Sequence, residues 1–463
     1  MATTGDFDLY YDDNPWSVVD KNQRVWYDPE LIAKYRQQAL FTPTIQFMRN
    51  LYDVRTTKMV VTQLLDPHPD TTALAVRQIW MPASHLDSRS VEITFSRYGG
   101  KVAYNFYDDI VTYWRQNNQE GIRQITRGAL GNHMIDVLDL LARNAYLKGA
   151  IDSGFVLYQG AGSSFNSLAI TDLFNVNTGM DIWLGMAQRG VAAALGAAGA
   201  NNNIICYTSP SVIYDIQKAT GGGSAGDQWI TINQYANPTA LLKYEVGSYK
   251  QIRFVQSPKL CLWNCGEVVA QGLVDAAINA GDGAPAPGTT KVDNTYMVGQ
   301  TTGAIKNYVS IGSWDVGSIA SISVNDIVSI HTTRTSAYGV TNGVDPFEGT
   351  LTNRRVTAKG ATTLVFDQPI MVDMNTNLGS GVYAYVTKGR NIHGSIFVGG
   401  NDGIVSGVAI PPRYHAPQAI DDFESVQRFS WDAYMGYQTY APEVFEVVFS
   451  SGTTRIKGAA GVQ

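Results

Sequence analysis

The clearest hydrophobic pattern in the chain has a helical period and covers residues 118–149. Apolar residues recur there every three or four positions and form a wide stripe, which is typical of an amphipathic helix. Asn118 can cap the start of this helix, and Lys148 followed by Gly149 predicts its end. At about 1.5 Å per residue the helix is about 45 Å long, which is more than twice the average length.

Alternating polar and apolar residues predict a β-hairpin within residues 76–115, with its turn at Gly99-Gly100. A glycine pair between two alternating runs is a common signal for a tight turn. By period two, the apolar positions of each expected strand share a face: Val91, Ile93 and Phe95 in the first strand, and Val102, Tyr104 and Phe106 in the second.

Residues 1–75 scatter aromatic side chains among Asp, Asn and Pro and contain one short helical pattern. That pattern, Asp28–Leu40, begins with an Asp cap and has Pro in its first turn. The segment is too aromatic for a disordered tail and too broken for a domain. We therefore predict an extended arm that needs another surface to pack against.

Residues 150–275 mix helical and strand patterns. A strand ends at Ser209-Pro210, where Pro opens a helix. Further on, we expect a turn at Gly247 and a strand at Gln251–Gln256. This part of the chain predicts a mixed α and β body.

Residues 285–390 differ from the rest of the chain, because short strand patterns follow one another at regular spacing after the Pro- and Gly-rich stretch "APAPGTT". Such spacing, with turn residues between the runs, predicts a small barrel or sandwich. The mixed character of the body returns after residue 390. The β-rich block is therefore expected to be an inserted domain.

The composition is low in charge and rich in tyrosine. Charged residues make up 16% of the 463 residues, hydrophobic residues make up 44%, and there are 25 tyrosines. Tyrosine offers large contact area and a hydroxyl for the wet edge of an interface. The net charge of −6 argues against a dedicated nucleic-acid-binding module, which would show a basic patch.

Neither end of the chain carries a targeting signal that we can identify. The N-terminus, "MATTGDFDLYYDDNPW", is acidic and aromatic and lacks the basic and apolar regions of a signal peptide. No apolar run reaches the length of a membrane span. The three cysteines, Cys206, Cys261 and Cys265, form no disulfide framework, and we expect buried thiols in a reducing compartment rather than a metal site.

None of the catalytic motifs that we considered is present in the sequence. The Gly-rich Ala219–Asp227 is not followed by the Gly-Lys-Ser/Thr of a phosphate-binding loop, and Gly160–Ser164 does not have the spacing of a nucleophile elbow. No two histidines have metal-ligand spacing, and His133 on the long helix is expected to be a packing residue. The sequence thus predicts a structural protein and no enzyme.

Two sets of charged residues allow more than one functional interpretation. Asp421-Asp422 with Glu424 could bind a cation, but acids at a helix start, or partners for a neighbour's arginine, are the favoured alternative. Arg354-Arg355 and Arg413 are candidate interface arginines.

The order of arm, hairpin, long helix and mixed body resembles the major capsid protein of tailed double-stranded DNA phages, the Hong Kong 97-like fold. Tyr207–Gln217 ("YTSPSVIYDIQ") and Tyr244–Pro258 ("YEVGSYKQIRFVQSP") are similar to segments of the coat proteins of N4-like podophages, as is "LAITDLFNVNTG". The β-rich block, which includes Arg354-Arg355 and "FDQPIM", resembles a domain inserted in several such proteins.

The resemblance implies an α+β fold with five parts. In this sequence they correspond to an N-terminal arm at 1–75, an E-loop hairpin at 76–115, the spine helix of the peripheral (P) domain with the axial (A) domain at 116–284, an inserted β-barrel-like domain at 285–390, and a return to the P and A domains at 391–463.

The function implied is self-assembly into the icosahedral shell of a virion around double-stranded DNA. The implied partners are copies of the chain in hexamers and pentamers, with separate scaffolding, portal and decoration or cement proteins, and assembly takes place in the host cytoplasm. No cofactor, metal or membrane is expected. The alternatives are a tail or decoration protein, or a β-rich carbohydrate-binding protein. A tail or decoration protein would lack the long helix, and a secreted carbohydrate-binding protein would carry a signal peptide.

In a shell protein the contacts between copies are the function, and aromatic residues are favoured in such interfaces. The candidate contact residues are Tyr10, Trp16, Trp26, Phe95, Tyr98, Tyr104, Phe106, Tyr434, Tyr437 and Tyr440. For the aromatic stretch Tyr414–Pro442, packing in the subunit core and packing between subunits remain equal alternatives, above all for Phe423, Phe429 and Trp431.

Overall fold

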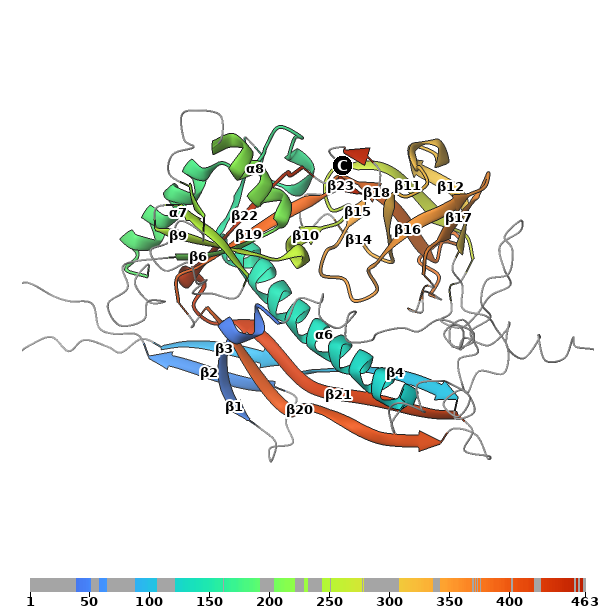
Figure 1. Ribbon diagram of the computed structural model, residues 1–463, viewed down its shortest axis with the longest axis horizontal. Coiled ribbons are helices and arrows are strands. Elements are labelled where there is room, and N and C mark those ends of the chain that lie inside the picture. The colour runs from blue at the N-terminus through green and yellow to red at the C-terminus, as the bar shows by residue number, and fades with distance from the viewer. Residues whose placement is uncertain are drawn as a thin grey trace, which may run out of the picture.

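A single long helix, α6 (Gly121–Ser153), lies across the centre of the subunit and contacts most of its other parts (Figure 1). The computed structural model describes residues 39–50, 58–64, 88–105, 121–160, 162–191, 204–220, 229–231, 244–249, 251–276, 278, 308–335, 342–368, 370, 372, 374, 376–400, 403–419, 426–453, 455–456 and 459–460. The long helix predicted at 118–149 is confirmed. The predicted cap Asn118, the linker at 284–290 and most of the helix at Asp28–Leu40 lie outside the described residues.

The predicted end of this helix at Gly149 is wrong by about one turn. Gly149 lies inside α6, and a β-carbon there would overlap Thr439 Oγ1. The glycine thus permits close contact between the helix and a neighbouring strand. The helix instead ends before Gly154, whose φ of 79° is the left-handed conformation favoured after a helix C-terminus.

Below α6 lies a four-stranded sheet with the order β1-β20-β21-β4 (Figure 1). Its strands are β1 (Gln46–Asn50), β20 (Ile404–Ala419), β21 (Val426–Thr439) and β4 (Ser96–Asn105). β1 pairs parallel to β20, and the other two pairs are antiparallel. Alternate residues of β21 face α6, so Phe429 and Trp431 are buried with Leu130 of the helix. These two aromatic rings therefore belong to the core of the subunit.

The hairpin turn predicted at Gly99-Gly100 is wrong. Both glycines lie inside β4, where each pairs with a residue of β21. A β-carbon on Gly99 would come within 2.7 Å of the Trp431 carbonyl oxygen, and one on Gly100 within 2.9 Å of the His133 ring. The two glycines allow β4 to approach its neighbours closely, a tertiary reason that a local pattern does not reveal.

A hairpin does precede the helix, but it is formed by β2 (Lys58–Leu64) and β3 (Ser88–Thr94), which pair antiparallel. Val91, Ile93 and Phe95 are buried, as their common face predicts. Ile93 and Phe95 pack against Val405 on the sheet face opposite α6. Residues 65–87, which join the two strands, lie outside the described residues.

The mixed body is an eight-stranded sheet above α6, with the order β5-β22-β19-β6-β9-β8-β7 and β10 paired to β19. Its strands are β5 (Val156–Tyr158), β22 (Phe445–Ser450), β19 (Ile392–Val398), β6 (Ile204–Thr208), β9 (Ile252–Gln256), β8 (Glu245–Tyr249), β7 (Trp229–Thr231) and β10 (Cys261–Leu262). Helices α7 (Val176–Gln188) and α8 (Pro210–Thr220) contribute to the core of this layer. The strand followed by a helix at Ser209-Pro210 is confirmed. The turn predicted at Gly247 is wrong, because Gly247 lies within β8.

The β-rich block is confirmed as a closed barrel with the order β11-β12-β17-β16-β13-β18 (Figure 1). Its strands are β11 (Val268–Val274), β12 (Tyr308–Val316), β17 (Thr363–Phe366), β16 (Thr352–Lys359), β13 (Ile327–His331) and β18 (Ala384–Gly389). It encloses an apolar core of its own. The first barrel strand, β11, lies before residue 285, where the sequence places the start of the inserted domain.

The remaining elements are short. They are the strand pairs β14 (Arg334–Thr335) with β15 (Gly343–Val344) and β23 (Arg455–Ile456) with β24 (Ala459–Ala460), and the 3-10 turns η1 (Thr42–Thr44), η2 (Phe165–Ser167), η5 (Pro258–Leu260), η6 (Ile319–Ser321) and η7 (Pro442–Val444). Within the described part of the chain, no helix is both long and apolar enough to cross a membrane.

Two glycines of α6 offer a matched test of this packing. Gly149→Ala should lower the urea midpoint of unfolding, with a destabilisation of about 1–3 kcal/mol, because the added methyl group collides with Thr439. Gly128→Ala should raise the midpoint slightly, by up to about 1 kcal/mol, because no atom lies within 4 Å of the new methyl group and Ala favours the helix. Equal effects of the two substitutions would contradict the close contact at Gly149.

Candidate functional site

The described end of the arm enters the subunit between α6 and the eight-stranded sheet. Phe41 is fully buried, and its ring lies 5.5 Å from that of Tyr207 on β6. The Tyr146 hydroxyl of α6 donates to the Thr44 carbonyl oxygen at 3.1 Å. Residues 39–45 of the arm are thus held by the core and do not lie on the surface as a loose strand.

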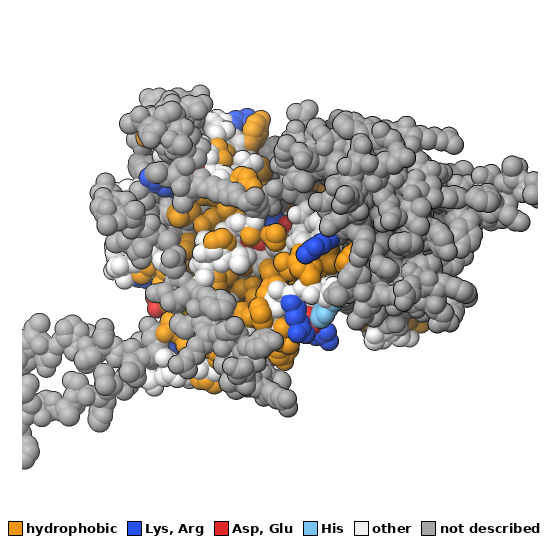
Figure 2. Space-filling model, turned by 60° about the horizontal axis from the view of Figure 1, so that its bottom comes forward, with side chains coloured by type: hydrophobic (Ala, Val, Ile, Leu, Met, Phe, Trp, Pro, Cys, Tyr) orange, Lys and Arg blue, Asp and Glu red, His pale blue; other side chains and the backbone are white. Residues whose placement is uncertain are grey.

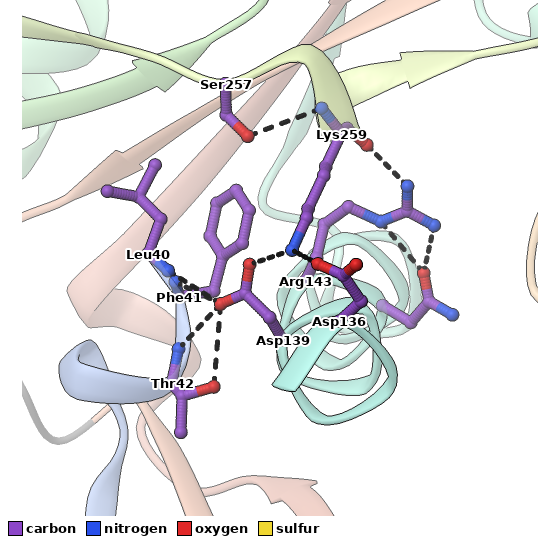
Figure 3. Close-up of polar contacts among 9 residues, drawn as sticks. Leu40, Phe41, Thr42, Asp136, Asp139, Arg143, Ser257 and Lys259 are labelled. Atoms are coloured by element: carbon purple, nitrogen blue, oxygen red, sulfur yellow. Dashed lines mark hydrogen bonds and ion pairs between the residues drawn. The ribbon is translucent and has the colours of Figure 1, made fainter. Parts of the chain in front are cut away.

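One buried carboxylate organises this entry point. Asp139, on α6, is fully buried, and its Oδ1 accepts hydrogen bonds from three consecutive backbone N–H groups of the arm (Figure 3). The distances are 2.8 Å to Leu40, 2.7 Å to Phe41 and 3.3 Å to Thr42. Hydrogen bonds to an ionised acceptor are stronger than neutral ones, and three of them fix the backbone of the arm.

The other oxygen of the same carboxylate faces the eight-stranded layer. Lys259 of η5 donates from Nζ to Asp139 Oδ2 at 2.9 Å and pairs with Asp136 Oδ1 at 3.0 Å. Arg143, one turn further along α6, donates to the Lys259 carbonyl oxygen (Figure 3). Burial lowers the pKa of Arg143 to about 10, which leaves it charged at neutral pH.

We refer to Asp139, Lys259 and the backbone N–H groups of residues 40–42 as the Asp139 joint. It connects the arm, α6 and the eight-stranded layer through one side chain. A charge in the interior must be paired, and breaking such a pair by removing one partner costs about 3–5 kcal/mol. The joint therefore gives the arm one defined starting position.

A second polar cluster lies on the face of the four-stranded sheet opposite α6. Asp432 of β21 accepts from Arg97 of β4 at 3.0 Å and from Arg413 of β20 at 2.9 Å, and His415 lies 2.8 Å from the same oxygen as Arg413. The Asp432 side chain is only 8% exposed, whereas that of Arg97 is 73% exposed. One carboxylate thus cross-links three adjacent strands.

The charged groups of this cluster lower the pKa of Asp432. The hydrogen bond from Arg413 is the largest cause that holds the pKa of Asp432 well below its usual range, and the hydrogen bonds from His415 and Arg97 act in the same direction. Burial opposes them. Asp432 therefore stays ionised at any pH at which an ordinary aspartate would be ionised.

The structure describes the side chains of only half of the predicted contact residues. Four residues lie outside the described part of the chain: Tyr10, Trp16, Trp26 and Phe106. For Tyr104 the structure describes only the backbone, within β4. Phe95, Tyr434 and Tyr440 pack together near Ile93, whereas Tyr98 and Tyr437 pack in the core beneath α6. The structure holds one subunit, so their role in contacts between subunits stays a prediction.

The cysteines and His133, which were tested as reactive or metal-binding groups, take part in packing. Burial raises the pKa of Cys261 to about 12 and also raises the pKa values of Cys206 and Cys265. The thiols of Cys206 and Cys265 are buried, as predicted, whereas Cys261 is partly buried. His133 is exposed on α6, not half-buried as expected, and it accepts a hydrogen bond from Trp431 Nε1 at 3.2 Å. Over the part of the chain that is described, no group of three or more His, Cys, Asp or Glu side chains could hold a metal ion. Asp421, Asp422 and Glu424 lie outside that part.

Sequence reasoning missed Asp139 and Asp432 as organising residues. For Asp139 a signal existed, since the helical pattern places two aspartates, Asp136 and Asp139, among apolar positions. A charged residue at such a position predicts a buried partner. For Asp432 no local signal exists, because its partners are contributed by two other strands.

Comparison with known proteins gives a likeness of fold alone. No protein-family model and no curated protein matches the sequence. The fold is similar to a solved structure described as the capsid of Ralstonia phage GP4, with a TM-score of 0.50 and 10% identity over 93% of this chain and 96% of that chain. Weaker likenesses include the capsid of the cyanophage P-SCSP1u (TM-score 0.45, 7% identity, 90% of each chain) and that of the cyanophage Pam1 (TM-score 0.42, 10% identity, 95% and 98%). The α+β fold is thus shared with the Ralstonia phage chain over nearly its whole length.

Replacement of Asp139 by Asn should release the arm. Asp139→Asn removes the buried charge that pairs with Lys259, so Asp136, which is half-exposed, is the ion-pair partner that remains. We therefore expect a destabilisation of about 3 kcal/mol or more and faster protease cleavage near residues 39–45. Asp136→Asn is the matched control, because Asp136 pairs with the same lysine but is 39% exposed, and it should cost less than about 1 kcal/mol. Equal urea midpoints for the two variants would refute the joint.

The Asp432 cluster should give a pH-dependent contribution to stability. As pH falls through about 4, the unfolded carboxyl takes up a proton while the folded one stays ionised, so unfolding becomes more favourable. The stability contributed by Asp432 is therefore present above about pH 4 and is lost as pH falls toward its depressed folded pKa. The urea midpoints of the native chain and of Asp432→Asn should differ most at pH 7 and converge at low pH. A gap that is constant with pH would contradict this assignment.

Proposed function

We propose that this chain is a major capsid protein that self-assembles into the icosahedral shell around a double-stranded DNA genome. The observation that carries the proposal is the likeness of fold to the Ralstonia phage GP4 capsid over 93% of this chain and 96% of that chain. A match of both chains over almost their full lengths is wider than a match of one domain. It therefore supports a shared architecture better than a match of one common domain would.

The internal organisation supports the same function. The four-stranded sheet has α6 on one face, while the hairpin β2–β3 covers only part of the other. The outward side of that hairpin carries Val60, which is 61% exposed. We take this exposed apolar side chain as a candidate contact with another copy. The long helix disfavours a tail or decoration protein.

The finer parts of the proposal follow the Hong Kong 97-like resemblance. The spine helix is α6 with the four-stranded sheet as P domain, the eight-stranded layer is the A domain, and the β2–β3 hairpin is the E-loop. Arms and E-loops clasp adjacent subunits in hexamers and pentamers and reorient when a precursor shell expands. Scaffolding, portal and cement proteins are the further partners. The sequence resembles the coat proteins of N4-like podophages, and the role in the virion is structural rather than enzymatic.

Assembly is the direct test. The full chain, expressed alone and with a scaffolding protein, should give closed shells or rings of five and six subunits by size-exclusion chromatography and negative-stain electron microscopy. A monodisperse monomer under both conditions would refute the function.

A surface substitution tests the role of the hairpin. Val60→Asp places a charge at the exposed position of β2 and should lower the yield of particles about tenfold, while the thermal midpoint of the subunit stays unchanged. Val324→Asp is the control, because Val324 is 46% exposed on the barrel block and its replacement should leave the yield unchanged. Equal losses in both variants would remove the hairpin from the contact.

A further inference from the structure

One histidine of the barrel has both ring nitrogens in buried hydrogen bonds. His331, the last residue of β13, is fully buried, whereas the histidine visible in Figure 2 lies at the surface beside Lys and Arg side chains. Its Nδ1 lies 3.1 Å from the Thr333 carbonyl oxygen, which can only accept, so Nδ1 carries a proton. Its Nε2 lies 2.8 Å from Thr387 Oγ1. In the neutral ring, Nε2 therefore accepts a hydrogen bond from the Thr387 hydroxyl.

A chain of hydrogen bonds continues from Nε2 to a residue outside the barrel strands. Thr387 Oγ1, on β18, accepts from Gln271 Nε2 of β11 at 2.9 Å. The same Gln271 nitrogen donates to the Asn342 carbonyl oxygen at 2.6 Å. Each bond in this chain has a defined direction once His331 is neutral. The neutral ring thus helps to hold the backbone at Asn342.

Asn342 begins a short segment that packs into the core of the body. We refer to residues 342–351 as the docking segment. Val344 is fully buried in the core between α6 and the eight-stranded sheet, and Phe347 and Leu351 pack against that core. Figure 1 shows β15, which belongs to this segment, between the barrel and the eight-stranded layer. The docking segment therefore attaches the barrel to the body.

A second connection joins the docking segment to the end of β13. The Glu348 carboxylate accepts from the backbone N–H groups of Thr332 and Thr333 at 2.7 and 3.1 Å, in the two residues that follow His331. Gln271 Oε1 is buried there and has no hydrogen-bond partner among the described residues. An unpaired buried acceptor lowers the stability of the docked arrangement. His331 is thus connected to two points of a segment whose hydrogen bonding is incomplete.

The surroundings of His331 oppose a charge on its ring. Burial is the largest cause and lowers the pKa of His331 to about 4, while Glu348 favours the protonated ring and Arg334 disfavours it. The ionisable groups that the described elements bring near the ring and its charged neighbours are Glu348 and Asp345 of the docking segment, Arg334 of β14, Asp315 of β12, Tyr385 of β18 and Lys148 of α6.

We propose that the docking segment is an acid-sensitive switch: a neutral His331 holds the barrel against the body, and protonation of His331 releases the segment. A proton on Nε2 removes the acceptor of the Thr387 hydroxyl and places a charge in the interior, which is costly unless the contact opens to water. The pKa of His331 is about 4 when docked and near its ordinary 6.5 when open. The stability of the docked state is therefore complete above about pH 6.5 and is lost as pH falls toward 4. Every contact lies within one subunit, so this inference does not depend on the proposed function.

Hydrogen exchange measured by mass spectrometry at pH 7 and pH 5 tests the switch on the full chain. Protection factors, corrected for the intrinsic exchange rate at each pH, report the equilibrium between the docked and the open segment. In peptides that cover residues 342–351, protection should fall about twentyfold between pH 7 and pH 5, because only the open state takes up a proton in this range. Strand β9 of the body should be more strongly protected at both pH values. Equal protection in the two places would mean that the segment opens only when the whole chain unfolds, and would overturn the inference.

Substitution of the histidine identifies the titrating group. His331→Gln keeps a neutral hydrogen-bonding side chain, and protection of residues 342–351 should then change less than about twofold between the two pH values. His393→Gln is the matched control, because His393 is also fully buried and burial also lowers its pKa to about 4, but it lies on β19 beside Ser209 of the body. The twentyfold fall should persist in that variant.

The outcomes of these experiments are distinct. A fall in His331→Gln equal to that of the native chain would assign the effect to another group and refute the switch. If His331→Gln does not fold, the native chain decides, since a fall in the docking segment with β9 still more strongly protected supports the switch and pH-independent protection of the segment refutes it.

Discussion

The fold depends on the buried Asp139 carboxylate, because it is the side chain at which the arm, the long helix and the eight-stranded layer meet. Each of its oxygens serves a different part: one accepts three backbone N–H groups of the arm, and the other accepts the Lys259 ammonium. Apolar packing could hold the same parts together, but it is not directional. A fixed acceptor with fixed donors holds the backbone of residues 40–42 in one position against α6.

The four-stranded sheet sets the second constraint. It is one layer thick, and α6 covers only one of its faces, so the other face must be covered by the hairpin, by charged groups or by another molecule. Asp432 stabilises this open face by joining β4, β20 and β21 through its arginine and histidine partners. The same contacts hold exposed guanidinium groups in fixed positions.

Local pattern was sufficient to predict α6, the strand and helix around Ser209-Pro210, and the barrel, because in each the period of apolar residues matches the element that buries them. It failed at Gly99, Gly149 and Gly247, which were expected to mark a turn or a helix end. At the first two, glycine is needed because a strand or a helix from elsewhere in the chain comes too close for a β-carbon. Local pattern did not reveal Asp432 for the same reason, because its partners Arg97 and Arg413 are 335 and 19 residues away in sequence.

Charge is distributed unevenly along the chain. Five of the six net negative charges lie in the first thirty residues, so the rest of the chain carries one net negative charge. A chain that is close to neutral beyond its first thirty residues has little charge repulsion between copies, which suits the proposed self-assembly.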